Sequence, residues 1–116
     1  MRTGGTMGTG STDIIRGTAD MLILRLLAIE PMHGWGIGRH IEQRSKENLR
    51  IQPGALYASL HRLTREGWIR SAWRTTDNGQ RARYYTLTAA GARRLAEETA
   101  NWRRLSRGVA LILAPE

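Results

Sequence analysis

The sequence predicts a mainly α fold that carries one small β-hairpin, an α+β arrangement. Three observations support this: apolar residues recur at helical spacing in three segments over residues 18–65, Asn78-Gly79 marks a hairpin turn, and a long terminal segment carries a further apolar stripe. Helix, helix, helix, hairpin is the order of a winged helix-turn-helix module, in which the third helix enters the DNA major groove and the hairpin, or wing, contacts the backbone or minor groove. The terminal segment adds a helix that we expect to dimerise.

The first two helices form the support for the third. We expect the first helix at residues 18–29, with Thr18 as its N-cap and the Glu30-Pro31 step as its end. It is apolar on most sides, which predicts burial on two faces. The second helix follows a glycine-rich turn and extends to about residues 45–48. That turn matches neither glycine-rich phosphate-loop pattern, so we interpret its glycines as allowing close helix packing.

The third helix carries the candidate DNA-reading face. Pro53 starts it, Gly67 closes it, and Leu56, Leu60 and Leu63 form its buried stripe. At 100° per residue the opposite face is small at its N-terminal end and basic or hydrogen-bonding further along, which suits close approach to base edges. This face consists of Gly54, Ala58, His61, Arg62 and Arg65.

The hairpin and the last helix complete the fold. Residues 68–74 and 82–87 are rich in aromatic and β-forming residues, and basic side chains lie at the tip and shoulders of the predicted hairpin. Thr88 is expected to cap a helix that runs to about Leu113. Its apolar stripe has nearly heptad spacing, which requires a partner surface.

The size and composition of the chain limit its class. With 116 residues it is one domain, which we divide into a flexible tail at 1–12, a DNA-binding domain at 13–87 and a dimerisation helix at 88–116. It contains no cysteine, which excludes disulfides and thiolate metal sites. No apolar run approaches the ~20 residues that a bilayer requires, and no signal core precedes the first helix. We therefore expect a soluble, cytoplasmic protein with no membrane partner.

The net charge is the most informative bulk property. The chain has 18 Lys and Arg residues against 10 Asp and Glu residues, a net charge of +8. Seven basic and two acidic residues fall within residues 50–83, the part that also contains the third helix and the hairpin. This clustering favours a nucleic-acid-binding surface over an evenly solvated charged face.

Several short motifs, in order, resemble the PadR family of bacterial transcriptional regulators. They are Gly17-Thr18, Pro31-Met32-His33-Gly34-Trp35-Gly36-Ile37, Gly54-Ala55-Leu56-Tyr57, Leu60-His61-Arg62-Leu63 with Gly67-Trp68-Ile69, and Tyr84-Tyr85-Thr86-Leu87-Thr88-Ala89-Ala90-Gly91. The resemblance covers about residues 14–113 and is strongest to short members with a single C-terminal helix, of the acidobacterial type. It implies a homodimeric repressor of a transporter or stress-response operon, whose last helix dimerises and whose DNA affinity responds to a small molecule.

The chain departs from the family pattern at two positions in the third helix. Ala55 stands where relatives usually have Thr or Ser, and Ala58 stands where they usually have Pro. These departures bear on the operator sequence rather than on DNA binding itself. Ala55 and Ala58 remain among the residues predicted to contact an inverted-repeat operator in double-stranded DNA. The full set is Gln52, Gly54, Ala55, Tyr57, Ala58, His61, Arg62, Arg65, Arg74, Arg81 and Arg83.

A homodimer interface and an effector site are predicted around the first and last helices. Paired Trp102 side chains are either dimer core or the wall of a pocket for an apolar or planar aromatic effector. We interpret Trp35, Trp68 and Trp73 as packing residues, and Tyr57 as a side chain whose ring lies beside the buried stripe while its hydroxyl reaches a phosphate. The dimerisation residues are predicted to be Leu22, Leu26, Leu95, Trp102, Leu105, Val109 and Ile112.

Other functional classes fit the sequence less well. The three histidines lie in three different elements and form no metal-binding or nucleophilic constellation, so we expect neither an enzyme nor a metal or other cofactor. A nucleoid-type basic protein without sequence preference explains the charge equally well, and footprinting separates it from a repressor. An interaction module that dimerises for other purposes has only the apolar last helix in its favour.

Overall fold

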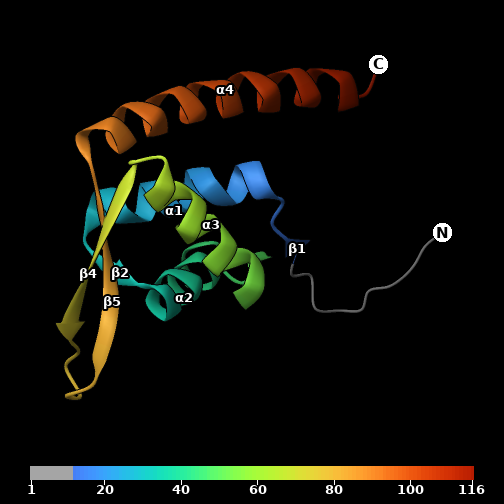
Figure 1. The fold of residues 1–116 in the computed structure, drawn as a ribbon. Coiled ribbons are helices and arrows are strands. Elements are labelled where there is room, and N and C mark those ends of the chain that lie inside the picture. The colour runs from blue at the N-terminus through green and yellow to red at the C-terminus, as the bar shows by residue number, and fades with distance from the viewer. Residues whose placement is uncertain (1–11) are drawn as a thin grey trace.

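A computed structural model describes residues 12–116 and confirms the predicted α+β fold. The predicted tail at residues 1–11 lies outside the described residues, whereas Thr12, which we assigned to the tail, begins the first strand. Figure 1 shows α4 lying across one end of the molecule and the hairpin pointing away from it. In chain order the elements are β1 (Thr12–Asp13), α1 (Arg16–Ile29), β2 (Met32–His33), α2 (Gly34–Arg44), β3 (Leu49–Arg50), α3 (Pro53–Arg65), β4 (Ile69–Thr75), β5 (Arg81–Leu87) and α4 (Ala89–Leu113).

Helix α1 is the centre of the core. It contacts α2, α3, α4 and β5 of the same chain, so its two buried faces are both covered within one subunit. Leu26 is only 5% exposed and belongs to this core, which corrects its assignment to the dimer interface; Leu22 is half-buried. The predicted N-cap is also wrong. The helix begins at Arg16 after an extended Ile15, whose carbonyl accepts a hydrogen bond from the Ala19 N–H at 2.9 Å. Thr18 therefore lies inside the first turn, where it cannot act as the N-cap, and no side chain caps the helix.

The second helix begins and ends earlier than predicted. It starts at Gly34, so the glycine-rich segment that we interpreted as a turn forms its first part. It ends at Arg44, and Lys46 and Glu47 then adopt positive φ angles of 53° and 66°, which end the helical path. The chain then forms the short strand β3, which pairs in parallel with β1, so that Thr12 lies opposite Leu49. Sequence periodicity gave no sign of this pairing, because each strand has only two residues.

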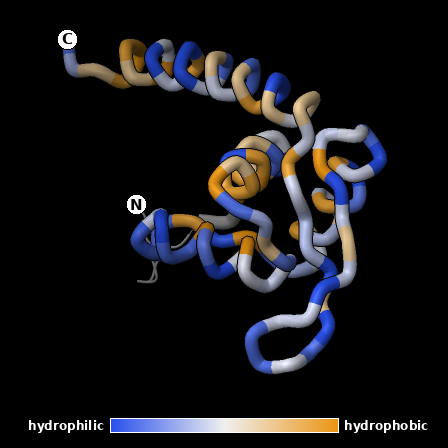
Figure 2. The backbone as a smooth tube through the Cα atoms, turned by 90° about the vertical axis from the view of Figure 1, so that its left-hand side faces the viewer, coloured by the Kyte–Doolittle hydropathy of each residue, from blue (hydrophilic) through white to orange (hydrophobic). Residues whose placement is uncertain are grey.

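The wing is an antiparallel pair extended by one short strand. The sheet order is β2-β5-β4, with Ile69 opposite Leu87 at the base and Thr75 opposite Arg81 near the tip. Gly79 adopts a φ of +85° in the turn, as the Asn-Gly pair predicts. Figure 2 shows that the hairpin tip is hydrophilic. The wing is therefore anchored at its base and polar at its end.

The junction between the wing and α4 is tightly fixed. The Thr88 hydroxyl accepts a hydrogen bond from the Gly91 N–H at 3.0 Å, as predicted for the cap, and donates one to the Gly67 carbonyl at 2.7 Å. A Cβ atom at Gly91 would lie 2.0 Å from the Trp68 carbonyl oxygen. Glycine is thus required for the start of α4 to pack against the loop that follows α3.

Candidate nucleic-acid interface

The outer face of α3 is free of large aliphatic residues. Leu56, Leu60 and Leu63 are buried, as is Ser59, whereas the predicted contact residues on the other side reach solvent. Gly54 has nothing within 4 Å of an added Cβ, so the start of the helix presents bare backbone. The exposed members of the predicted set in this region are Gln52, Gly54, Ala55, Tyr57, Ala58, His61 and Arg65.

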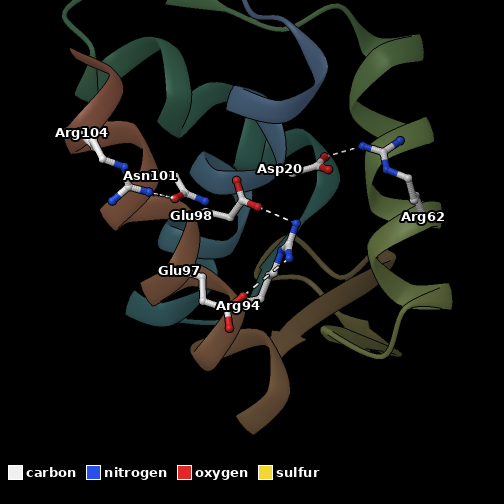
Figure 3. Close-up of polar contacts among 7 residues, drawn as sticks. All are labelled: Asp20, Arg62, Arg94, Glu97, Glu98, Asn101 and Arg104. Atoms are coloured by element: carbon white, nitrogen blue, oxygen red, sulfur yellow. Dashed lines mark hydrogen bonds and ion pairs between the residues drawn. The ribbon is translucent and has the colours of Figure 1, made fainter. Parts of the chain in front are cut away.

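Arg62 does not belong to that outer face. Its guanidinium Nη2 lies 2.5 Å from the Asp20 carboxylate on α1 (Figure 3). The same nitrogen lies 3.2 Å from the Ser59 hydroxyl. Only 17% of the Arg62 side chain is exposed. The prediction that Arg62 reads bases is therefore inconsistent with this structure, because the side chain is mostly buried and its Nη2 is bound to Asp20 on α1.

The wing arginines are arranged on aromatic rings. The guanidinium carbons of Arg81 and Arg83 both lie 5.3 Å from the centre of the Trp73 ring, and that of Arg74 lies 4.5 Å from the centre of the Tyr84 ring. Such cation–π contacts contribute about 0.5–1 kcal/mol at exposed sites. They restrict the positions of these guanidinium groups at the surface of the wing.

A groove of about 420 Å³ separates α3 from the wing. The Arg83 Nε donates a hydrogen bond to the Ser71 hydroxyl at 3.0 Å, which directs this arginine along the groove. Burial raises the pKa of the Tyr85 phenol, although the neighbouring Arg83 opposes the shift, so the hydroxyl remains a donor at neutral pH. Basic side chains and neutral donors suit a nucleic-acid backbone. The lining residues are Tyr57, Leu60, His61, Thr64, Arg65, Ser71, Arg83 and Tyr85.

Tyr57 joins the two helices of the helix-turn-helix unit. A Cβ atom at Gly34 would lie 2.7 Å from the Tyr57 hydroxyl oxygen, so the ring packs over the first residue of α2. The side chain nevertheless remains 51% exposed. The structure places the ring and its hydroxyl against Gly34, and contact of the hydroxyl with a phosphate stays a prediction.

Two tryptophans predicted to be packing residues are instead exposed. Trp35 is 66% exposed and Trp73 is 55% exposed, whereas Trp68 packs against the core as expected. Trp35 also makes a cation–π contact, since the Arg39 guanidinium lies 5.1 Å from its ring centre. Both were missed because residue type favours burial of tryptophan. For Trp73, the neighbouring Arg70 and Arg74 were an available signal that the ring lies at the surface, whereas the glycine-rich surroundings of Trp35 gave none.

A second depression lies between the start of α1 and the middle of α4. It has a volume of about 240 Å³, and Trp102, 45% exposed, forms part of its wall. Leu105 also lines it, whereas Val109 does not. The complete lining is Ile15, Gly17, Thr18, Met21, Glu98, Asn101, Trp102 and Leu105.

The predicted dimerisation residues of α4 differ in their environment. Leu95 packs against the core of its own subunit. Further along α4, beyond Leu95, the large apolar side chains are exposed. They are Trp102, Leu105, Val109, Leu111, Ile112 and Leu113. Among residues 12–116, no three His, Asp or Glu side chains are grouped so that they could hold a metal ion. No helix in the described part of the chain has the length and apolarity needed to cross a membrane.

Comparison with known proteins agrees with this geometry. The profile of the PadR-like family of transcriptional regulators matches residues 23–97. A transcriptional regulator from Mycobacterium tuberculosis is 33% identical over 94 residues, which cover 81% of this chain and 84% of that protein. An uncharacterized protein from Lysinibacillus sphaericus is 32% identical over 91 residues, covering 78% of this chain and 84% of its own.

Solved structures extend the likeness to the whole described fold. A PadR family transcriptional regulator from Eggerthella lenta superposes with a TM-score of 0.73 at 31% identity, covering 87% of this chain and 86% of that one. A transcriptional regulator from Clostridium thermocellum superposes with a TM-score of 0.78 at 25% identity, covering 85% and 93%.

Proposed function

Because the chain belongs to the PadR-like family of transcriptional regulators, we propose that it is a homodimeric repressor that binds an inverted-repeat operator through α3 and the wing. The observation that carries this proposal is the pairing of a bare, polar α3 face with a wing whose arginines are already held on aromatic rings. In this role the protein acts in the cytoplasm, on double-stranded DNA. Its family is one of regulators rather than of enzymes.

The proposed division of labour follows the chain. Residues 13–87 bind DNA, with α3 contacting base edges from Gln52, Gly54, Ala55, Ala58 and His61. The backbone is bound by Tyr57, Arg65 and the wing arginines Arg74, Arg81 and Arg83. Residues 88–116 dimerise, since the exposed apolar end of α4 needs a second protein surface and a two-fold pair supplies one.

The depression between the start of α1 and the middle of α4 is the proposed effector site. Trp102 and Leu105 supply an apolar wall, which fits an apolar or planar aromatic compound. A ligand there acts only through its different affinities for two dimer geometries, typically a 5- to 150-fold change in DNA affinity. By resemblance to its family, the regulated operon encodes a transporter or a stress response.

Selection of genomic fragments by the purified protein tests the DNA-binding proposal. We expect recovered duplexes to share an inverted repeat with half-sites about one helical turn, roughly 34 Å, apart. A nuclease footprint should protect both half-sites. Steeply salt-dependent binding to all duplexes with no shared sequence would instead identify a nucleoid-type protein.

Tryptophan fluorescence tests the effector site. A panel of planar aromatic compounds should quench emission from the wild-type protein, with a smaller change in Trp102→Phe, and should release the selected duplex. If no compound binds, or if binding leaves DNA affinity unchanged, Trp102 is dimer core and the protein regulates through its abundance.

A further inference from the structure

The ion pair between Asp20 and Arg62 joins the central helix to the DNA-reading helix. These residues lie 42 positions apart in the chain, one on α1 and one on α3, and their side chains are only 18% and 17% exposed. The same guanidinium nitrogen also lies within hydrogen-bond distance of Ser59 on α3, so Arg62 is bound on both sides. Figure 3 shows the pair bridging the two helices.

Another ion-pair group in the same view has a different character. Arg94 lies 3.6 Å from Glu97 and 2.6 Å from Glu98, and all three residues belong to α4. Arg94 and Glu97 are 40% and 67% exposed. Arg94 also lies 4.7 Å from the centre of the Trp68 ring, so only the exposed Glu97 is changed in the control described below. Surface pairs within one helix contribute little to stability. They therefore provide a natural control for the interhelical pair.

The close-packed apolar contacts of α3 limit its rotation, but less sharply than a directional polar contact does. Leu56, Leu60 and Leu63 fill the core, but apolar contact is non-directional and tolerates small rotations of a helix. With a radius of about 5–6 Å, a helix that turns by about 15° moves its outer atoms by about 1.5 Å, more than a hydrogen bond to a base tolerates. A half-buried ion pair with a planar guanidinium is directional and resists that rotation.

We propose that Asp20 is a positioning residue for operator recognition, because it holds Arg62 and thereby fixes the rotation of α3 relative to α1. This inference rests on the proposed function, since it assumes that α3 reads bases. Asp20 itself contacts no DNA. Apolar packing alone allows small rotations of α3, and the role of Asp20 is to restrict the helix to one orientation of its outer face.

Simple electrostatics makes the opposite prediction for Asp20. Asp20→Asn raises the net charge of the chain by one, as does the control Glu97→Gln on α4. If Asp20 acted only through its charge, both variants would bind every duplex slightly more tightly. If it positions α3, Asp20→Asn alone lowers the ratio of affinity for the selected operator to affinity for a scrambled duplex of the same length and composition.

A double variant separates positioning from stability. Replacing a buried ion pair by apolar residues is often neutral or stabilising, so Asp20→Leu/Arg62→Met should fold and keep the net charge of the wild type. Its apolar contact is non-directional, however, and should leave α3 free to rotate. We expect its melting temperature to stay near that of the wild type while its specificity ratio falls roughly 2- to 30-fold.

The measurements are fluorescence anisotropy titrations with the recovered operator and the scrambled duplex, at several salt concentrations, together with thermal melts. The proposal is supported if Asp20→Asn and the folded double variant both lose specificity while Glu97→Gln does not. It is overturned if the double variant keeps the wild-type ratio. A wild-type protein that binds both duplexes equally would overturn the proposed function as well, so the two failures are distinguishable.

Discussion

Helices α3 and α4 are both amphipathic, but the apolar face of α3 is buried whereas most of the apolar face of α4 is exposed. The apolar stripe of α3 is buried by its own chain, and its outer face contains small, polar and basic side chains. Along α4 only Gly91 is fully buried, and the large apolar residues beyond Leu95 are exposed. The two helices therefore differ in what their own chain covers: the apolar face of α3 is buried and its outer face suits a polyanion, whereas the apolar end of α4 is left uncovered.

The largest effect is expected from a substitution in the exposed apolar face of α4. Leu105→Asp places a charge in the proposed two-fold interface, and loss of about 1.5–3 kcal/mol per subunit raises the dimer dissociation constant roughly 10²- to 10⁴-fold. Sedimentation equilibrium measures the change, and operator binding should be lost with it. Ala100→Asp, on the opposite side of α4, makes the same charge change and should remain dimeric. A wild-type chain that sediments at 13.0 kDa would contradict the interface.

The next effect concerns the junction that holds the two regions together. Gly91→Ala drives a Cβ atom into the Trp68 carbonyl, so the start of α4 must move and the chain should lose about 1–3 kcal/mol of stability. Urea unfolding at fixed protein concentration measures it. Gly54→Ala, at a helical glycine with open space around it, should leave stability unchanged or slightly raised. Equal stabilities for the two variants would show that α4 does not pack closely at Gly91.

A change on α3 should sharpen the comparison by altering sequence preference. Gln52→Ala removes a predicted contact to a base edge and should change discrimination at one operator position by about 1–3 kcal/mol. Competition titrations against single-base operator variants provide the measurement. Gln43→Ala, an exposed residue of the same type on α2, should leave preference unchanged. A uniform loss across all duplexes would assign Gln52 to the backbone instead.

The smallest effect should come from the wing. Arg83→Ala should weaken binding to every duplex and lower the slope of log affinity against log salt by roughly 1, the value for one lost phosphate contact. Trp73→Leu removes the ring beneath Arg81 and Arg83 but no charge, so it should weaken binding by about 2- to 5-fold with the slope unchanged. Titrations over a salt series distinguish the two. If Arg83→Ala leaves the slope unchanged, Arg83 does not contact a phosphate.

Local patterns were sufficient for much of the fold. The start of α3 at Pro53, its buried stripe, the cap at Thr88 and the turn at Gly79 depend on residues close together in the chain, and each was predicted correctly. The α1 cap failed for the opposite reason. A hydroxyl at Thr18 offers one local hydrogen bond, whereas the helix already begins at Arg16, shortly after Ile14, whose N–H donates to the distant Arg50 carbonyl.

The sequence by itself determined the order of elements, the location of the basic segment and which face of each helix is apolar, because these properties are set by composition and by periods of two and 3.6 residues. Tertiary structure decided where those faces meet. It buried Leu26 inside the subunit and left Trp35 and Trp73 in solvent, because periodicity does not specify which neighbour covers a residue. It also turned Arg62 from an apparent reader of bases into the partner of Asp20, since an ion pair across 42 residues exists only once α1 and α3 are packed together.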